Sequence, residues 1–439
     1  MSSPSTPPHT MPLGKDSRFE PMCTPCESIE MYRPGGFHPV IVGDTLHKRY
    51  RVIRKLGAGS HATVWLAEDT ARVKYVALKV HAAKVDVTNE VSIQQQLGVN
   101  ISKDISSRFL ILASDSFILE GPNGRHFCFV TEPMGPSIST VLKAPCKGEF
   151  DPLNPPDNRL STSRNKGILR SVLSGLELLH SNDIVHGDLQ PGNLLFPLGD
   201  ISNFTPNELQ STALRDLVKR KDGKTDLWSP KYLIAPEPIT EESVQVRDMV
   251  RLADFGGAFR NDHPPSSPVT PLAYRAPEII LGSKVDCAID IWSFGCFMFE
   301  LLTDTTLFRV SGFFNPPQVV DDTHFIELSD VLGPLPQHIR DAWPRYSLYY
   351  GQNGDRLNSR PSDFDDTEEG KARRTRWPSH TFGLPVTQSL EDRFLERKSQ
   401  DMGMEEAQEI LSLLREILQI EPSKRPSVAQ LLAKRWFQV

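Results

Sequence analysis

The sequence predicts an α+β fold in two parts, an N-terminal antiparallel β-sheet with one helix and a mainly α-helical C-terminal part. Short segments of alternating apolar and polar residues fill positions 49 to 131, whereas apolar residues recur at helical spacing from 165 onward. With 439 residues, the chain also exceeds the size that a single hydrophobic core usually organises. Two parts with separate cores are therefore expected.

The N-terminal part is predicted to be a sheet, preceded by an extension. Residues 1 to 40 are rich in Pro, Ser and Thr, which is typical of a disordered segment. The following part, 41 to 133, contains predicted strands at 50–56, 63–67, 75–80, 109–119 and 126–131 and a predicted helix at 87–97. A Gly-Pro-Asn-Gly turn at 121–124 joins the last two strands.

The C-terminal part, 134 to 439, is predicted to be helical. Helices are expected at 165–180, 288–303, 407–418 and 427–437. The helix at 288–303 is apolar on nearly all sides, which predicts a buried position.

Two insertions interrupt this order. The first, 197 to 245, is predicted to begin with a helix, because Thr205 and Glu208 have the spacing of a capping box and Gly223 would end it. Its apolar face would comprise Leu209, Leu214, Leu217 and Val218. The second insertion, 353 to 385, is polar and poor in aliphatic residues, so a mobile loop is expected there.

Composition excludes several classes of protein. The chain has 49 Lys and Arg against 55 Asp and Glu, a net charge of −6, which argues against direct nucleic-acid binding. Six cysteines form no dense disulfide framework and indicate a reducing compartment, and Cys23-x-x-Cys26 lacks a second pair at zinc spacing. The N-terminus has no apolar run typical of a secretion signal, and polar residues interrupt the most apolar run, 289–302. A soluble protein is expected.

The predicted sheet carries three elements of a phosphate-binding site. The motif Gly57-x-Gly-x-x-Ala62 lies between two strands, which favours a flexible cover over phosphates, although an ordinary hairpin turn is the alternative. Lys79, in Val76-Ala-Leu-Lys79, follows on its own strand, where a lysine can reach phosphates. Glu90 falls on the next helix and could hold Lys79 by an ion pair; a solvated helix face is its alternative.

The helical part supplies the remaining chemistry. The stretch from Ile184 to Phe196 places Asp188 two residues after His186 and five before Asn193. Asp254-Phe-Gly256 follows a predicted strand, and its carboxylate is a hard oxygen ligand of the kind that Mg²⁺ prefers. Ala276-Pro-Glu278 comes next. Each motif is weak alone, but their fixed order is specific for phosphate transfer.

On these motifs, residues 49 to 437 resemble a eukaryotic protein kinase domain. The resemblance implies a two-lobed fold with ATP in the cleft, Asp188 as the base toward the substrate hydroxyl, and Asn193 and Asp254 as Mg²⁺ ligands. It also implies that Asp290 braces the catalytic loop, His186 to Asn193, and that Arg425 pairs with Glu278.

The resemblance extends to individual site residues. The catalytic set would be Asp188, Lys79 and Gln190, and Thr131 would be the gatekeeper of the hinge Thr131-Glu-Pro-Met134. ATP would be bound by Leu56, Gly57, Ala58, Gly59, Val64, Ala77, Lys79, Glu90, Thr131, Glu132, Met134, Asn193, Leu195 and Asp254.

Within the kinases, the chain is most similar to the SR-protein kinases. The similarity lies in Tyr32-Arg-Pro-Gly-Gly-Phe-His-Pro39, in Tyr50-x-Val-Ile-Arg-Lys-Leu-Gly57 and in the position of the 197–245 insertion. It implies transfer of the γ-phosphate of ATP to serine in Arg/Ser-rich proteins, a role in regulating mRNA splicing, and a monomer of the cytoplasm and nucleus. Asp321, Asp322 and Asp330 lie where that family carries acidic docking residues, although a solvated acidic loop is the alternative.

Two residues depart from the family pattern. Gly187 replaces the arginine that usually receives an activation-loop phosphate, so we expect no such switch. Gln190 replaces a lysine that contacts the transferred phosphate, and loss of one such donor typically costs about 10²–10³ in kcat. An active serine/threonine kinase is the main hypothesis. The alternatives are a catalytically weak pseudokinase that acts as a binding scaffold and a kinase with a different substrate.

Overall fold

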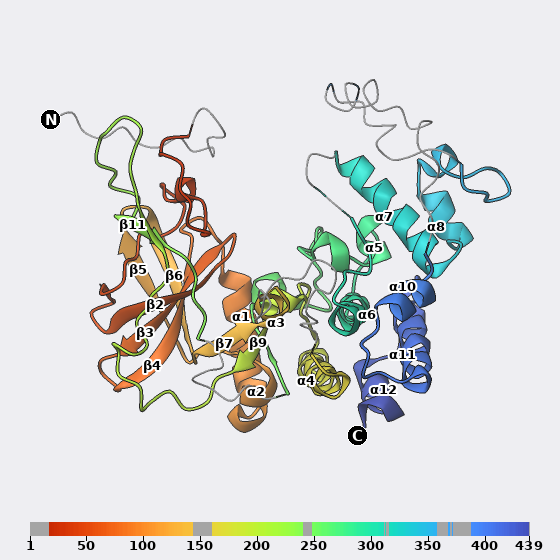
Figure 1. Cartoon of the computed structure of the whole chain (residues 1–439), viewed down its shortest axis with the longest axis horizontal. Coiled ribbons are helices and arrows are strands. Elements are labelled where there is room, and N and C mark those ends of the chain that lie inside the picture. The colour runs from red at the N-terminus through yellow and green to blue at the C-terminus, as the bar shows by residue number, and fades with distance from the viewer. Residues whose placement is uncertain are drawn as a thin grey trace. The chain divides into compact units, whose positions relative to one another are not determined.

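A computed structural model describes residues 17–143, 160–239, 248–310, 312, 316–357, 368, 371 and 388–438. The chain divides into two compact units (Figure 1). Unit 1 comprises Met1–Ser137 and Leu195–Ala253, and unit 2 comprises Ile138–Leu194 and Asp254–Val439. Unit 1 is built on β-strands and unit 2 on helices, as the sequence predicts.

The core of unit 1 is a six-stranded antiparallel sheet in the order β1-β2-β3-β4-β6-β5. Its strands are β1 (Thr45–Leu46), β2 (Tyr50–Ala58), β3 (Ala62–Asp69), β4 (Lys74–His81), β5 (Asp115–Gly121) and β6 (Gly124–Thr131). A three-stranded sheet contains β7 (Met134–Ser137), β9 (Leu194–Pro197) and β12 (Arg251–Leu252). The alternating pattern of the sequence buries one face of the larger sheet around Trp65, Leu78 and Val130.

Two helices accompany the sheet, α1 (Thr88–Asn100) and α2 (Lys103–Phe109). The strand predicted from 109 to 119 is wrong in its first half, because Phe109 ends α2 and β5 begins only at Asp115. Leu110 instead forms a parallel bridge with Leu252, and the Ile111 N–H donates to the Leu252 carbonyl at 2.9 Å. A partner distant in sequence therefore sets the conformation of this segment.

The described part of the N-terminal extension, 17–40, packs on the rest of unit 1, in contrast to the expected disorder. Phe19, Ile29, Tyr32 and Phe37 are buried in a cluster that includes Leu233 of the insertion. The few apolar residues of the extension are enough to hold it in place, because apolar residues of the insertion pack against them in the same cluster. The Glu20 N–H also donates to the carbonyl of Lys219 at 2.9 Å, so the two segments are joined along their backbones.

The helix predicted at the start of the insertion is wrong. Its capping contacts do form, since the Thr205 N–H and hydroxyl both donate to Glu208 at 2.7 Å. The chain then leaves the helical path, and β10 (Arg215–Leu217) pairs with β11 (Tyr232–Ile234). Leu217, expected on a buried helix face, is 69% exposed. The pairing of β10 with β11 thus overrides the local helix signal. Most of the 353–385 loop lies outside the described residues.

A buried ion pair joins the N-terminal extension to β2. The ammonium group of Lys55 pairs with Glu27, and the two side chains are 1% and 5% exposed. Lys55 also donates to the Ile234 carbonyl of the insertion at 3.3 Å and lies over the ring of Trp65. Extension, insertion and sheet therefore meet at one buried charge.

Glu27→Ala is expected to destabilise unit 1 by about 3–5 kcal/mol, because it leaves the Lys55 ammonium buried without its counterion. Urea denaturation followed by tryptophan fluorescence measures the loss. Glu68→Ala is the control, because it removes an exposed pair with Arg51 and should cost at most about 1 kcal/mol. Equal midpoints for the two variants would contradict the expectation.

Unit 2 is a bundle of helices of very different lengths. The described helices are α3 (Ile138–Leu142), α4 (Thr162–His180), α5 (Pro277–Ile280), α6 (Ala288–Thr303), α7 (Pro317–Leu332), α8 (Gln337–Ala342), α10 (Leu390–Arg397), α11 (Met404–Ile417) and α12 (Val428–Leu432). The prediction for α6 is confirmed, since nearly all of its side chains are buried. In the described part of the chain, no helix combines the length and apolarity needed to cross a membrane.

Candidate active site

Unit 1 places the predicted phosphate-binding elements on adjacent strands. The motif from Gly57 to Ala62 spans the end of β2, a turn and the start of β3, and the Gly59 N–H closes the turn by donating to the Ala62 carbonyl at 2.9 Å. In the sheet, Val64 of β3 faces Lys79 of β4. No side chain or backbone lies within 4 Å of where a Cβ on Gly57 or Gly59 would stand. The backbone of this turn is therefore open to a ligand.

The predicted ion pair between Lys79 and Glu90 is present. The ammonium nitrogen of Lys79 lies 2.9 Å from Oε1 of Glu90, whose carboxylate is largely buried on α1. Burial strengthens the attraction relative to an exposed pair. The pair fixes the direction of the lysine side chain and ties α1 to β4.

The other predicted nucleotide-binding residues of unit 1 lie along the neighbouring strands. Ala77 of β4 pairs with Thr131 at the end of β6. Glu132 forms an ion pair with Arg251 of β12. Met134 is buried on β7, and Leu195 of β9 pairs with Ser137. The segment from Thr131 to Met134 thus joins the six-stranded sheet to the three-stranded sheet.

Unit 2 brings together the predicted catalytic residues Asp188, Gln190 and Asn193. Oδ1 of Asp188 accepts a hydrogen bond from the side-chain amide of Gln190 at 2.8 Å, and Oδ2 accepts one from Asn193 at 2.9 Å. Burial raises the pKa of the Asp188 carboxyl, and nearby Asp254 adds to the rise, while His186, Asn193 and Gln190 oppose it. The carboxylate is therefore held by two neutral donors.

Asn193 and Asp254 fit the Mg²⁺ site that the sequence predicts. Both hydrogen bonds of the Asn193 amide nitrogen go to Asp188, one to its backbone carbonyl and one to its carboxylate, which orients the side-chain oxygen as a metal ligand. Asp254 has a left-handed backbone, with φ of 64°, and its Oδ1 accepts from the Gly256 N–H at 3.2 Å. Amide and carboxylate oxygens are hard ligands suited to Mg²⁺.

Asp290 braces the catalytic loop, as the resemblance implies. Its two carboxylate oxygens accept from the backbone N–H groups of His186 at 2.8 Å and Gly187 at 2.9 Å. His180 lies 2.9 Å from the same carboxylate. Burial alone would raise the pKa of Asp290, but the bond from His180 and the other donors lower it. A buried carboxylate on α6 thus fixes the backbone just before Asp188.

Gly187 allows the activation segment, which runs from Asp254 to Glu278, to pack directly on this loop. Its φ is +72°, and a Cβ here would stand 2.5 Å from the backbone oxygen of Gly257. The Thr270 hydroxyl donates to the Gly187 carbonyl at 2.6 Å. Sequence reasoning missed Thr270, and no pattern within the segment indicates this contact. Gly187 therefore contacts the residues around Gly257 and Thr270 through its backbone alone.

A second buried pair predicted by the resemblance is present. Nη1 and Nη2 of Arg425 donate to the Glu278 carboxylate at 2.6 and 2.8 Å. Bidentate geometry between two buried groups locks the end of the activation segment to the C-terminal helices.

The three acidic residues of α7 have different environments. Asp322 is buried and accepts from Trp343 at 2.8 Å and Tyr349 at 2.6 Å. Asp321 is partly exposed, and burial raises the pKa of its carboxyl while Arg275 lowers it. Asp330 is also partly exposed. Asp322 therefore supports the packing of α7, and only its two companions are open to a substrate.

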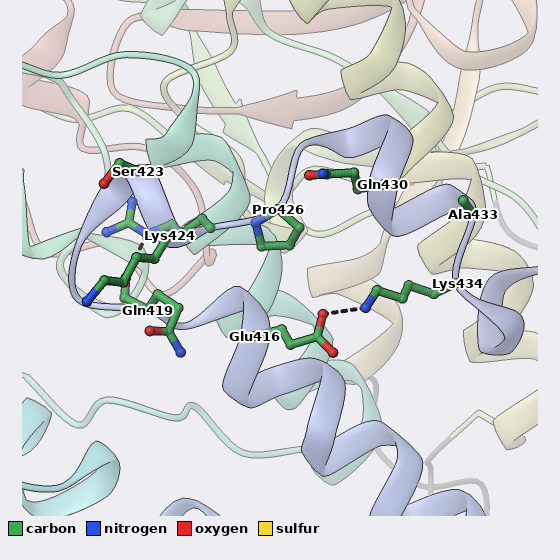
Figure 2. A pocket seen from close by; sticks show the side chains of 9 residues that line it. Glu416, Gln419, Ser423, Lys424, Pro426, Gln430, Ala433 and Lys434 are labelled. Carbon is green, nitrogen blue, oxygen red and sulfur yellow. Dashed lines mark hydrogen bonds and ion pairs between the residues drawn. The ribbon is translucent and has the colours of Figure 1, made fainter.

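A separate cavity of about 660 Å³ lies among the C-terminal elements of unit 2. Figure 2 shows its lining, which includes Glu416, Gln419, Lys424 and Lys434 but no residue of the catalytic loop. Lys434 pairs with Glu416 and Lys424 with Glu421. The lysines of this cavity are thus already neutralised.

Comparison with known proteins agrees with this geometry. The family model described as the protein kinase domain matches residues 50–437. The chain therefore belongs to the protein kinase family and, within it, to the SRPK-like group of serine/threonine kinases.

Individual relatives support the group assignment. The serine/threonine-protein kinase SRPK of Physarum polycephalum is 30% identical over 75% of this chain and 77% of its own length. The protein kinase dsk1 of Schizosaccharomyces pombe is 25% identical over 96% and 87%. A solved crystal structure of a kinase domain superposes with a TM-score of 0.60 at 22% identity, covering 92% of this chain and 99% of that one, which supports the fold.

Proposed function

We propose that this serine/threonine kinase transfers the γ-phosphate of ATP to serines of Arg/Ser-rich proteins and so regulates mRNA splicing. The observation that carries the catalytic proposal is the set Asp188, Gln190 and Asn193, hydrogen-bonded together around the Asp188 carboxylate. The similarity to the SRPK of Physarum polycephalum supports the substrate class. Partly exposed Asp321 and Asp330 are candidates to attract substrate arginines.

In this proposal each group has a defined role. Asp188 accepts the proton of the substrate hydroxyl and orients it for attack. Lys79, held by Glu90, binds ATP phosphates beneath the turn from Gly57 to Ala62. Asn193 and Asp254 hold Mg²⁺, which supplies charge neutralisation on the phosphates when bound. The proposal further holds that the protein is a monomer, that it acts in the cytoplasm and nucleus, and that it does not bind nucleic acid directly.

Gln190 is the feature that favours a weak or inactive kinase. One N–H of its amide is engaged by Asp188, and the group carries no positive charge toward a transferred phosphate. Gln190→Lys is therefore expected to raise kcat, by at most about 10²-fold, the lower end of the value of one preorganised donor.

Radiolabelled ATP with an Arg-Ser repeat peptide tests both points. The wild type is expected to label the peptide measurably and Gln190→Lys to label it faster. No transfer by the wild type, with recovery only in Gln190→Lys, would favour the pseudokinase scaffold. Transfer to a proline-directed peptide but not to Arg-Ser would instead reject the substrate class and leave the kinase activity standing.

A further inference from the structure

The carboxylate of Glu90 has a second basic neighbour besides Lys79. His81, at the end of β4, places Nε2 3.4 Å from Oε2 of Glu90, while Lys79 lies 2.9 Å from Oε1. Gln94 of α1 also donates to Oε1, at 3.4 Å. Each oxygen of the carboxylate therefore faces a nitrogen from β4.

The His81 ring is fixed from its other side. Its Nδ1 lies 3.2 Å from the backbone carbonyl oxygen of Phe127 on β6, and the ring packs edge-on against Phe129 at 5.5 Å between centroids. The residue is only 2% exposed. Its own carbonyl accepts from Nδ1 of His126 at 2.9 Å. The imidazole has little freedom to turn away from Glu90.

Both polar contacts of the ring are with acceptor atoms, the Phe127 carbonyl oxygen and the Glu90 carboxylate oxygen. A ring nitrogen that carries a proton therefore points its N–H at one of these two acceptors. The ionisable groups near His81 are Glu90, Lys79 and His126.

We propose that His81 is a positioning residue, which holds the Glu90 carboxylate so that Lys79 is directed at the phosphates of ATP. The proposal rests on the assignment of Lys79 and Glu90 as nucleotide-binding residues. Through Phe127 it ties Glu90 to β6, so that α1, β4 and β6 are coupled at one carboxylate. Lys79 acts on the ligand, and His81 acts only through Glu90.

ATP affinity, measured without peptide, tests the proposal independently of catalysis. His81→Phe removes both polar contacts and keeps an aromatic ring. We expect it to weaken ATP binding about tenfold, because the Glu90 carboxylate loses a contact that holds it toward Lys79, and to leave the KM of the peptide unchanged. His81→Gln keeps a neutral donor toward Glu90 and should recover affinity to within about threefold of the wild type.

A further variant separates positioning from mere packing. His38→Phe removes another histidine of unit 1, whose ring contacts His126 rather than Glu90, and should bind ATP as the wild type does.

The outcomes are distinguishable. Unchanged ATP affinity in folded His81→Phe, equal losses in His81→Phe and His38→Phe, or failure of His81→Gln to recover affinity would each overturn the proposal. A wild type that binds ATP without transferring phosphate would instead contradict the proposed function and leave the role of His81 intact. A wild type that binds no ATP would overturn both.

Discussion

Asp188→Asn is expected to reduce phosphate transfer by about 10²–10⁴-fold, because an amide cannot take the proton of the substrate hydroxyl. The change is nearly isosteric. The Asp188 carboxylate now accepts from Gln190 and Asn193, and the new side chain keeps one acceptor oxygen for them. The fold should survive, so the loss should appear in kcat and only weakly in the KM of ATP.

Initial rates of phosphate transfer from radiolabelled ATP check this expectation, and the thermal unfolding midpoint of the variant checks that it is folded. Asp341→Asn is the matched control, because it makes the same change at an exposed position of unit 2 and should leave the rate unaltered. A rate for Asp188→Asn within threefold of the wild type would mean that Asp188 is not the base.

Gly187→Ala is expected to lower kcat by about 10²-fold. The left-handed backbone there, with φ of +72°, costs a non-glycine residue about 1–2 kcal/mol. The added Cβ would also stand 2.5 Å from the Gly257 backbone oxygen, so the loop or the activation segment must shift. A displacement of about 1 Å at a catalytic group is enough for a loss of this size.

Gly282→Ala separates the two contributions to that loss. Gly282 also has a positive φ, of +63°, but no atom lies within 4 Å of its would-be Cβ. The Gly282→Ala variant should therefore lose about as much stability as Gly187→Ala, while its kcat stays at the wild-type value. Gly187→Arg carries the same Cβ, so restoring the usual arginine should not activate the enzyme. Full activity in Gly187→Ala would show that the close packing is not needed for catalysis.

The same packing bears on regulation. In the family pattern, an arginine at this position binds an activation-loop phosphate. Here the position is Gly187, whose carbonyl accepts a hydrogen bond from the Thr270 hydroxyl instead. We therefore keep the prediction that activity needs no such phosphate. A phosphorylation of the activation segment that raised kcat tenfold or more would contradict it.

Local sequence was sufficient to select the proposed catalytic residues and to predict the most regular elements. The order of motifs from Gly57 to Glu278 was sufficient to select Asp188, Asn193 and Asp254, because their chemistry requires fixed residue types at fixed spacings. The apolar run of α6 likewise predicted its bounds and its burial, since a helix that is apolar on all sides can only lie in a core.

Tertiary structure alone decided the features whose partners are distant in sequence. The described part of the extension, 17–40, is ordered because the insertion, some two hundred residues later, buries Phe19. The helix signal at Thr205 likewise loses to the pairing of β10 with β11. The contact of His81 with Glu90 depends on how α1 packs on β4. Local propensity is worth tenths of a kcal/mol per residue, whereas burial of one large side chain contributes about 1.5–3 kcal/mol, so long-range packing prevails where the two disagree.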